Sequence, residues 1–503
     1  MAKPKRSMKP ATFAWPVRPL IYEINAWTWL DELSRKHGRP IRLDSVPEEE
    51  WDALAQWGFD GVWLMGVWER SPAGRAIARA HPGLLEDYRR ALPDYTAEDV
   101  VGSPYCVHRY VVDARLGGPE GLRAVRRALA GRGLRLLLDF VPNHVARDHP
   151  WVAAHPEYLV RGSVEDLARD PGAYFECGGQ ILACGRDPFF PPWTDVAQLN
   201  AFDPGLRRAA IATLKEIAGQ CDGVRADMAM LLISEVFART WGLRAGTRAA
   251  QEYWAEVIAG VRAAFPGFLF IAEAYWDLEW TLQQQGFDYC YDKRLYDRLE
   301  YDSAESVRLH LSGEMAYQQR LVRFIENHDE PRAAATFGRE QARAAAVVIT
   351  TLPGAVLLHE GQLEGKRIRL PVQLGRRPEE PADAELLAFY RTLIRSIGRQ
   401  TMRSGVWSLC SRSGWPDNPR HLNLVAWCWA DRNLRHLVVV NLSDQHSQAR
   451  VQVPWAFLIG REWRLTDLLT GAVYERNGDE MRDPGLYVGL PPWGYHVLRL
   501  EAL

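Results

Sequence analysis

Short apolar runs alternate with longer helical stretches along most of the chain. The runs are bounded by polar residues, glycine or proline, which is typical of buried strands, and the stretches between them favour helices. Strands are predicted near residues 20–26, 61–67, 134–141, 222–228, 268–274, 287–291, 321–325 and 355–360. Helices are predicted at 47–57, 118–132, 204–219, 246–264, 303–318, 338–350 and 383–397.

This alternation predicts parallel strands joined by crossover helices. Eight such units with polar residues at the strand ends favour a TIM (β/α)8 barrel. An open doubly wound sheet is the alternative, but it would need a glycine-rich phosphate turn after an early strand, and the sequence has none. Two long connections interrupt the pattern, at 68–117 and at about 145–203, and we expect the second to be a small irregular insertion after the third strand.

The pattern changes near residue 400. Short strands separated by turn signals follow, which is typical of an antiparallel β-sandwich. These strands are predicted at 424–430, 436–442, 450–453 and 495–500. We therefore expect a barrel domain at 1–399, including the insertion, and a C-terminal β-sandwich domain at 400–503.

Composition narrows the class of protein. Hydrophobic residues make up 47% and charged residues 25% of the chain, which is ordinary for a globular protein, and the net charge of −2 gives no reason to expect nucleic acid or an anionic membrane as partner.

The basic N-terminus lacks the apolar region of a signal peptide, and no apolar run approaches the roughly 20 residues that span a bilayer. The seven cysteines include no C-x-x-C pair. We expect a cytoplasmic protein without cofactor or metal; the sequence does not indicate an oligomeric state.

Charged residues cluster where the predicted barrel strands end. The carboxyl ends of these strands meet at one edge of a barrel, so the side chains should lie together. Unpaired charges there are unfavourable, and we expect the arginine to compensate the carboxylates. Such a set favours a catalytic site over separate helix caps or salt bridges. Its members are Asp139, His144, Arg225, Asp227, Glu273, His328 and Asp329.

Four stretches resemble the four short sequence regions of the α-amylase family, glycoside hydrolase family 13. Their order, spacing and placement on strands match that family, and the predicted β-sandwich is similar to its C-terminal domain. The stretches are Asp139-Phe-Val-Pro-Asn-His144, Gly223-Val-Arg-Ala-Asp227, Ile271-Ala-Glu273 and Phe324-Ile-Glu-Asn-His-Asp329.

The resemblance implies a retaining glycosidase that acts on α-glucosidic linkages of oligosaccharides by double displacement. Asp227 would be the nucleophile, Glu273 the general acid and then the base, and Asp329 the carboxylate that supports the transition state. The resemblance also implies a set of substrate-binding residues, with an aromatic platform under the sugar among them. These are Tyr105, the platform, with Asp139, His144, Arg225 and His328.

Some positions depart from the family pattern. Many members have a Lys-His pair, for an acceptor subsite and a calcium ligand, where this chain has Met230 and Leu231, although Asn143 stays at a common calcium-ligand position. We therefore expect no structural calcium and no ordinary endo-acting amylase.

Other functions on the same scaffold stay open. A transglycosylase, a maltosyltransferase or a glycoside phosphorylase would share the double displacement. The stretch 148–152 resembles the same region of maltosyltransferases that use maltose 1-phosphate. The arginine-rich segment 367–377 would either bind a phosphate or form part of the solvated surface. A non-catalytic carbohydrate-binding relative is disfavoured because all three carboxylates are present.

Overall fold

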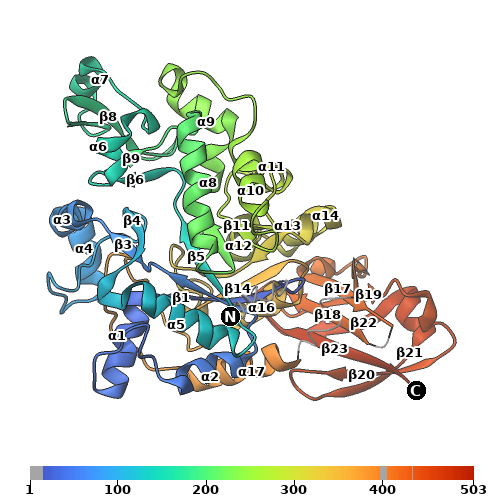
Figure 1. Ribbon diagram of the computed structural model, residues 1–503. Coiled ribbons are helices and arrows are strands. Elements are labelled where there is room, and N and C mark those ends of the chain that lie inside the picture. The colour runs from blue at the N-terminus through green and yellow to red at the C-terminus, as the bar shows by residue number, and fades with distance from the viewer. Residues whose placement is uncertain (1–14, 397–404, 433) are drawn as a thin grey trace, which may run out of the picture.

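The computed structural model describes residues 15–396, 405–432 and 434–503, and its first part is a closed barrel of eight parallel strands (Figure 1). The predicted TIM barrel is confirmed, and the open-sheet alternative is wrong, because the eighth strand pairs in parallel with the first. In barrel order the strands are β1 (Leu20–Asn25), β2 (Gly61–Met65), β5 (Arg135–Phe140), β10 (Gly223–Ala226), β11 (Leu269–Ala272), β12 (Tyr289–Tyr291), β13 (Leu321–Arg323) and β14 (Ala355–His359).

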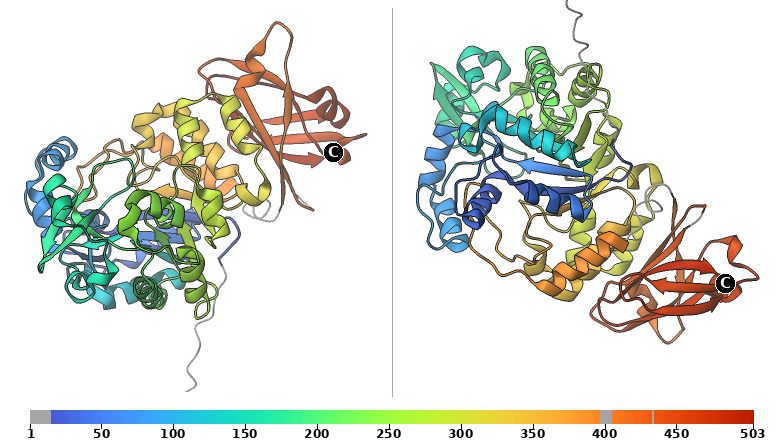
Figure 2. Two further views of the ribbon diagram at one scale, coloured as in Figure 1. Left: turned by 90° about the horizontal axis from the view of Figure 1, so that it is seen from above. Right: turned by 60° about the horizontal axis from the view of Figure 1, so that its bottom comes forward.

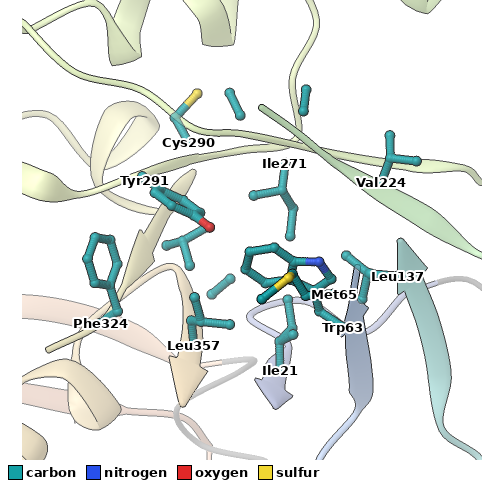
Figure 3. Close-up of a cluster of buried hydrophobic side chains, with 14 of the residues drawn as sticks. Ile21, Trp63, Met65, Leu137, Val224, Ile271, Cys290, Tyr291, Phe324 and Leu357 are labelled. Atoms are coloured by element: carbon teal, nitrogen blue, oxygen red, sulfur yellow. The ribbon is translucent and has the colours of Figure 1, made fainter. Parts of the chain in front are cut away.

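These segments form strands because both of their faces are covered. The barrel strands are almost wholly buried, with helices outside and side chains filling the interior, so they appear in sequence as continuous apolar runs rather than alternating ones. Figure 3 shows Ile21, Leu137, Ile271 and Leu357 gathered in this interior. The barrel is therefore packed, and chemistry is confined to its rim.

Helices surround the barrel and begin and end where local signals place them. Asp203 caps the N-terminus of α8 through the backbone N–H of Leu206, with Pro204 in the first turn, and α1 ends at Gly38, whose φ is +63°. The helix α1 was not predicted, because it starts directly where β1 ends. The main helices are α1 (Ala26–His37), α2 (Glu48–Trp57), α5 (Gly118–Ala130), α8 (Pro204–Ala218), α10 (Tyr253–Arg262), α12 (Lys293–Tyr301), α13 (Ala304–Leu311), α16 (Gly338–Thr351) and α17 (Ala384–Ser396).

Both long connections contain regular structure. The connection 68–117 holds β3 (Trp68–Arg70), α3 (Pro72–Ala80), α4 (Pro82–Ala91) and β4 (Val107–Val112). The insertion was expected to be irregular, and that expectation is wrong: it carries an antiparallel sheet with its own small core. Frequent glycine, proline and aromatic residues hid the period of its strands. In sheet order they are β6 (His144–Ala146), β9 (Trp193–Gln198), β8 (Gln180–Gly185) and β7 (Tyr174–Cys177).

Two antiparallel sheets form the C-terminal part, beside the barrel (Figure 2). On the central strand β17, Trp427 and Trp429 face the barrel core while Cys428 faces the core between the two sheets, as strand alternation requires. The predicted residue 399/400 boundary lies outside the described residues. The larger sheet is β15 (Val406–Leu409), β17 (Leu424–Ala430), β18 (Arg435–Asn441), β23 (Tyr495–Ala502), β20 (Glu462–Asp467) and β21 (Val473–Asn477); the smaller is β16 (Ser411–Ser413), β19 (Ser447–Gln452) and β22 (Leu486–Leu490).

Within the described ranges, none of the helices combines the length and the apolar character that crossing a membrane requires.

Candidate active site

The strand register places the predicted nucleophile beside the predicted acid. Arg225 on β10 pairs with Asp139 on β5, and Ala226 pairs with Ala272 on β11, so the next residues along β10 and β11 are neighbours. The backbone N–H of Asp227 donates to Phe140 O at 2.8 Å, and that of Glu273 donates to Ala226 O at 3.0 Å. These bonds continue the ladder past the strand ends and fix both carboxyl groups at the rim.

A loop beyond β13 brings in the third carboxylate. The side chain of Asn327 accepts the backbone N–H groups of Asp329 and Glu330, both at 2.9 Å, and closes a turn. The side chain of Asp329 is 39% exposed, whereas those of Asp227 and Glu273 are 7% and 3% exposed. Of these three carboxyl groups, that of Asp329 is the most open to a ligand.

The buried guanidinium of Arg225 is the centre of the site. Its Nη1 lies 2.7 Å from Asp227 Oδ1, and its Nη2 lies 2.9 Å from Glu273 Oε2. Asp329 and Asp139 follow at 3.8 and 3.9 Å. One cation thus faces four carboxyl groups, and these cannot all ionise without strong mutual repulsion.

Two of these carboxyl groups have raised pKa values. Burial raises the pKa of Asp227 to about 8; Arg225 opposes the shift, while Glu273 and Asp329 add to it. Burial likewise raises the pKa of Asp139 to about 6, against the opposing charges of Arg225 and His328. Because its pKa is raised above neutrality, Asp227 keeps a proton within this cluster near neutral pH.

His328 joins the rim to the first strand. Its Nε2 lies 2.9 Å from Asp329 Oδ2, and its Nδ1 contacts the carboxylate of Glu23 on β1. Burial alone would lower the pKa of His328, but Asp329 and Glu23 raise it well above its usual value. Burial would raise the pKa of Asp329, but His328 and Arg225 hold it well below its usual range. The two form an ion pair at neutral pH, in which His328 is buried and Asp329 is partly exposed.

Tyr105 lies between the two predicted sugar-binding histidines. Its ring stacks on His328 with centroids 5.4 Å apart, and its hydroxyl is 2.5 Å from His328 Nε2. On the other side, His144 Nε2 lies 3.1 Å from the backbone oxygen of Tyr105. Burial lowers the pKa of His144 to about 4, so this imidazole is neutral. The structure therefore brings all eight predicted site residues to one end of the barrel.

Two residues of this cluster were not predicted. Glu23 is a charged residue within a buried apolar strand, which is a signal that the sequence does contain. Tyr275 left no comparable signal; its hydroxyl donates to Glu273 Oε1 at 3.0 Å. The backbone N–H of Met228 donates to the other oxygen of Glu273 at 2.5 Å, from a left-handed conformation with φ of +43°.

The residues at the position where family members hold calcium do not fit that ion. The amide of Gln198 donates to both Asn143 Oδ1 and Asn143 O at 2.9 Å, which occupies the oxygen atoms a cation would need. Met230 and Leu231 are buried apolar side chains. No group of three or more His, Cys, Asp or Glu side chains in the described ranges is arranged to hold a metal.

The arginine-rich segment 367–377 is tied to the protein. Arg376 pairs with Asp94 and Asp99, and Arg377 pairs with Glu360. Arg369 is exposed and lines a polar hollow beside His328. Two of these arginines therefore hold the loop in place.

No model of a known protein family matches this chain. The chain is 26% identical over 399 residues to "Alpha-amylase MalA" of Haloarcula japonica, covering 76% of this chain and 48% of that protein. It is 20% identical over 306 residues to "Alpha-amylase 3" of Dictyoglomus thermophilum, covering 56% of this chain and 57% of that protein. The chain thus spans about half the length of the curated relatives it matches.

Solved structures resemble the whole chain. The maltogenic α-amylase AmyB from Thermotoga neapolitana superposes with a TM-score of 0.69 at 18% identity, covering 96% of this chain and 99% of that one. An α-amylase from Geobacillus thermoleovorans, in complex with acarbose, has a TM-score of 0.66 at 16% identity, with 97% and 99% covered. These likenesses show the fold. On that fold, the four sequence regions and the curated relatives make the chain similar to the α-amylase family, with no subfamily specified.

Proposed function

We propose that this chain is a retaining glycosidase that hydrolyses α-glucosidic linkages of oligosaccharides. The observation that carries the proposal is the pair of ion-pair contacts of Arg225, 2.7 Å to Asp227 and 2.9 Å to Glu273. Two carboxyl groups held against one cation, with one proton near neutral pH, provide a nucleophile and an acid in the same site.

In the first step, the Asp227 carboxylate attacks the anomeric carbon and forms a glycosyl ester. The proton of the carboxyl pair, placed on Glu273, passes to the leaving oxygen. Arg225 favours this distribution because its Nη1 donates to Asp227 at 2.7 Å. The reactive form of the site thus has Asp227 charged and Glu273 neutral. Because the pKa of Asp227 is raised to about 8, this form becomes more populated as pH rises toward that value.

In the second step, Glu273 is a carboxylate and takes a proton from water, whose oxygen attacks the anomeric carbon while the ester bond to Asp227 breaks and the Asp227 carboxylate leaves. The hydroxyl of Tyr275 and the backbone N–H of Met228 donate to the two oxygens of Glu273, so both stabilise the carboxylate formed by the first proton transfer. Two inversions at one carbon give net retention of the α-configuration.

Sugar binding is assigned to the more open side of the rim. Asp329 is held ionised by His328 and would accept hydrogen bonds from sugar hydroxyls. Neutral His144 and charged His328 flank Tyr105, whose ring would lie under the sugar. Both nitrogens of His328 are engaged by Glu23, Asp329 and Tyr105, so it would act on the sugar by holding Asp329 and Tyr105 in place. Asp139 and Arg225 complete the floor of this subsite.

The relatives support the class of substrate. Their names include α-amylases, a maltogenic α-amylase, an acarbose complex, a debranching enzyme and a trehalose-6-phosphate hydrolase. We therefore assign α-linked oligosaccharides of glucose as the substrate.

The test is product analysis of the purified protein with maltooligosaccharides, followed by NMR from the first turnover. We expect free reducing sugars whose new end is initially the α-anomer, with Asp227→Asn as the inactive control. An initial β-anomer would contradict the retaining mechanism. Longer transfer products, or a glycosyl phosphate formed only when phosphate is added, would assign the transglycosylase or phosphorylase alternative instead.

A further inference from the structure

Three aromatic rings surround the buried side chain of Arg225. Its Cζ lies 5.2 Å from the ring centroid of Tyr105, 5.4 Å from that of Trp63 and 5.7 Å from that of Tyr291. All three distances are within the range of a cation–π contact, which strengthens when water is excluded. Trp63 comes from β2 and Tyr291 from the end of β12, on strands that contribute none of the charged residues described above.

The guanidinium has its ion pairs on the rim side only. Nη1 donates to Asp227 and Nη2 lies at ion-pair distance from Glu273, whereas neither Nη2 nor the buried Nε has a hydrogen-bond partner. Toward the barrel interior, Arg225 borders a small hollow whose other lining residues are apolar or aromatic: Ile21, Trp63, Leu137, Ile271, Tyr291, Val322 and Leu357. On that side, the guanidinium meets the rings of Trp63 and Tyr291 and the hydroxyl of Tyr291 rather than a charged group.

Figure 3 shows Trp63 and Tyr291 within this interior cluster, with the hydroxyl of Tyr291 turned toward the centre of the cluster. Both side chains are at most 2% exposed. The Tyr291 hydroxyl lies close to Arg225 and the Trp63 indole N–H close to Asp139, but neither is in good hydrogen-bond geometry. Buried polar atoms with such weak partners are unfavourable for folding alone. The rings that carry them lie against Arg225, and this contact offers a reason for their presence.

We propose that Trp63 and Tyr291 are positioning residues that support Arg225 from inside the barrel and so keep it in reach of both Asp227 and Glu273. This inference rests on the proposed glycosidase function. Tyr105 is set apart from the pair, because its ring stacks on His328 and faces the sugar subsite. Trp63 also contacts His328, edge-on at 5.4 Å, so Tyr291 gives the cleaner test.

The consequence for the reaction follows from the geometry. Without the ring of Tyr291, the guanidinium can move toward the apolar interior and away from the carboxyl groups. The Asp227 carboxylate then loses stabilisation, and a higher pH is needed to ionise it. The acidic limb of the kcat/KM profile should therefore move to higher pH, while KM changes little because Tyr291 does not face the sugar.

The experiment compares Tyr291→Phe, which keeps the ring, with Tyr291→Leu, which removes it. Val322→Ala is the matched control, because Val322 lines the same hollow without a ring. We expect kcat of Tyr291→Phe within about threefold of the parent, and for Tyr291→Leu a loss of about tenfold or more in kcat at nearly unchanged KM, with the acidic limb shifted upward. Trp63→Phe and Trp63→Leu should repeat the contrast.

A structural role alone predicts a different pattern. If Val322→Ala, at a comparable loss of Tm, shifts the pH profile as Tyr291→Leu does, or if Tyr291→Phe is as impaired as Tyr291→Leu, the inference is overturned. A crystal structure of Tyr291→Leu separates this outcome from a failure of the proposed function. Contacts of Arg225 that stay in place overturn the positioning role even in an active enzyme; contacts that lengthen support it even where no α-glucoside is hydrolysed.

Discussion

The buried imidazole of His328 forms an ion pair with the partly exposed Asp329, with Nε2 2.9 Å from Oδ2, and its other nitrogen contacts Glu23, which lies 305 residues away in sequence. The arrangement ties the loop after β13 to the first strand of the barrel. It also keeps Asp329 ionised in a site where burial raises the pKa of Asp227 and Asp139. His328 thus keeps the exposed carboxylate of Asp329 ionised, while the pKa values of the buried carboxyl groups of Asp227 and Asp139 are raised.

Replacing His328 should make stability depend on pH in a defined direction. The pKa of His328 is raised on folding, so its contribution is full below about pH 6.5 and is lost as pH rises through the raised value. The pKa of Asp329 is lowered, so its contribution is present above about pH 4 and is lost only at lower pH. We expect His328→Asn to lower the free energy of unfolding by about 3 kcal/mol at pH 6 and by less near pH 10.

Urea unfolding of the parent and His328→Asn across pH 6–10 measures this difference. Other titrating groups are common to both proteins and cancel in the comparison. A gap that stays constant over this range would show that His328 is neutral in the folded protein. Glu23→Gln should show a smaller gap of the same sign, because Asp329 stays as a partner of His328.

Asp227→Asn should abolish turnover while making the fold less sensitive to alkali. The pKa of Asp227 is raised to about 8 on folding, from an unfolded value of about 4, so the parent loses stability as pH rises from about 4 to 8. The amide cannot ionise, so the Tm of Asp227→Asn relative to the parent should increase over that interval, and kcat should fall at least about 1,000-fold.

The thermal unfolding of both proteins at pH 5 and pH 8 gives the required comparison. Equal Tm differences at the two pH values would mean that Asp227 is already ionised at pH 5. Turnover near that of the parent would show that another group is the nucleophile.

Glu273→Gln should lose most of its activity on substrates whose leaving group must be protonated, and little on substrates whose leaving group needs no proton. An oligosaccharide leaving group needs a proton, so its kcat should fall about 1,000-fold or more, whereas a nitrophenyl glycoside leaves without one and should keep most of its first-step rate. Added azide should then restore turnover of the nitrophenyl substrate and give an α-glycosyl azide, because this nucleophile needs no general base.

Tyr275→Phe perturbs the same carboxyl group more mildly than Glu273→Gln does. It removes one hydrogen bond of 3.0 Å from Glu273 Oε1 but leaves the carboxyl group, so we expect a fall of about tenfold in kcat and no rescue by azide. Equal losses on the two classes of substrate in Glu273→Gln would contradict the role of Glu273 as the acid.

The sequence predicts those site residues whose positions follow from the local pattern of apolar and polar residues. Asp139, Asp227 and Glu273 each stand at the end of an apolar run, and the carboxyl ends of parallel strands must meet at one rim. No local pattern indicates the contact of Glu23 with His328. None indicates the contacts of Trp63 and Tyr291 with Arg225. They join strands far apart in sequence and exist only because the barrel closes.

The insertion shows the opposite difficulty. Its strands are local, but β7 and β8 are joined through Gly178 and Gly179, and proline and aromatic residues separate β8 from β9. These residues obscure the alternation of polar and apolar positions on which strand prediction depends.

Removal of divalent metal should leave this protein unchanged. The amide of Gln198 satisfies the side-chain and backbone oxygens of Asn143, and Met230 and Leu231 are buried and apolar, so the residues at this position need no cation. We expect Tm and kcat with EDTA to match those with calcium, as measured by thermal unfolding and initial rates. The variant Gln198→Ala should lower the Tm, because two buried acceptors lose their donor, at about 1–3 kcal/mol for each group left unsatisfied. A fall in the parent's Tm with EDTA that calcium reverses would instead show that a bound ion supports the insertion.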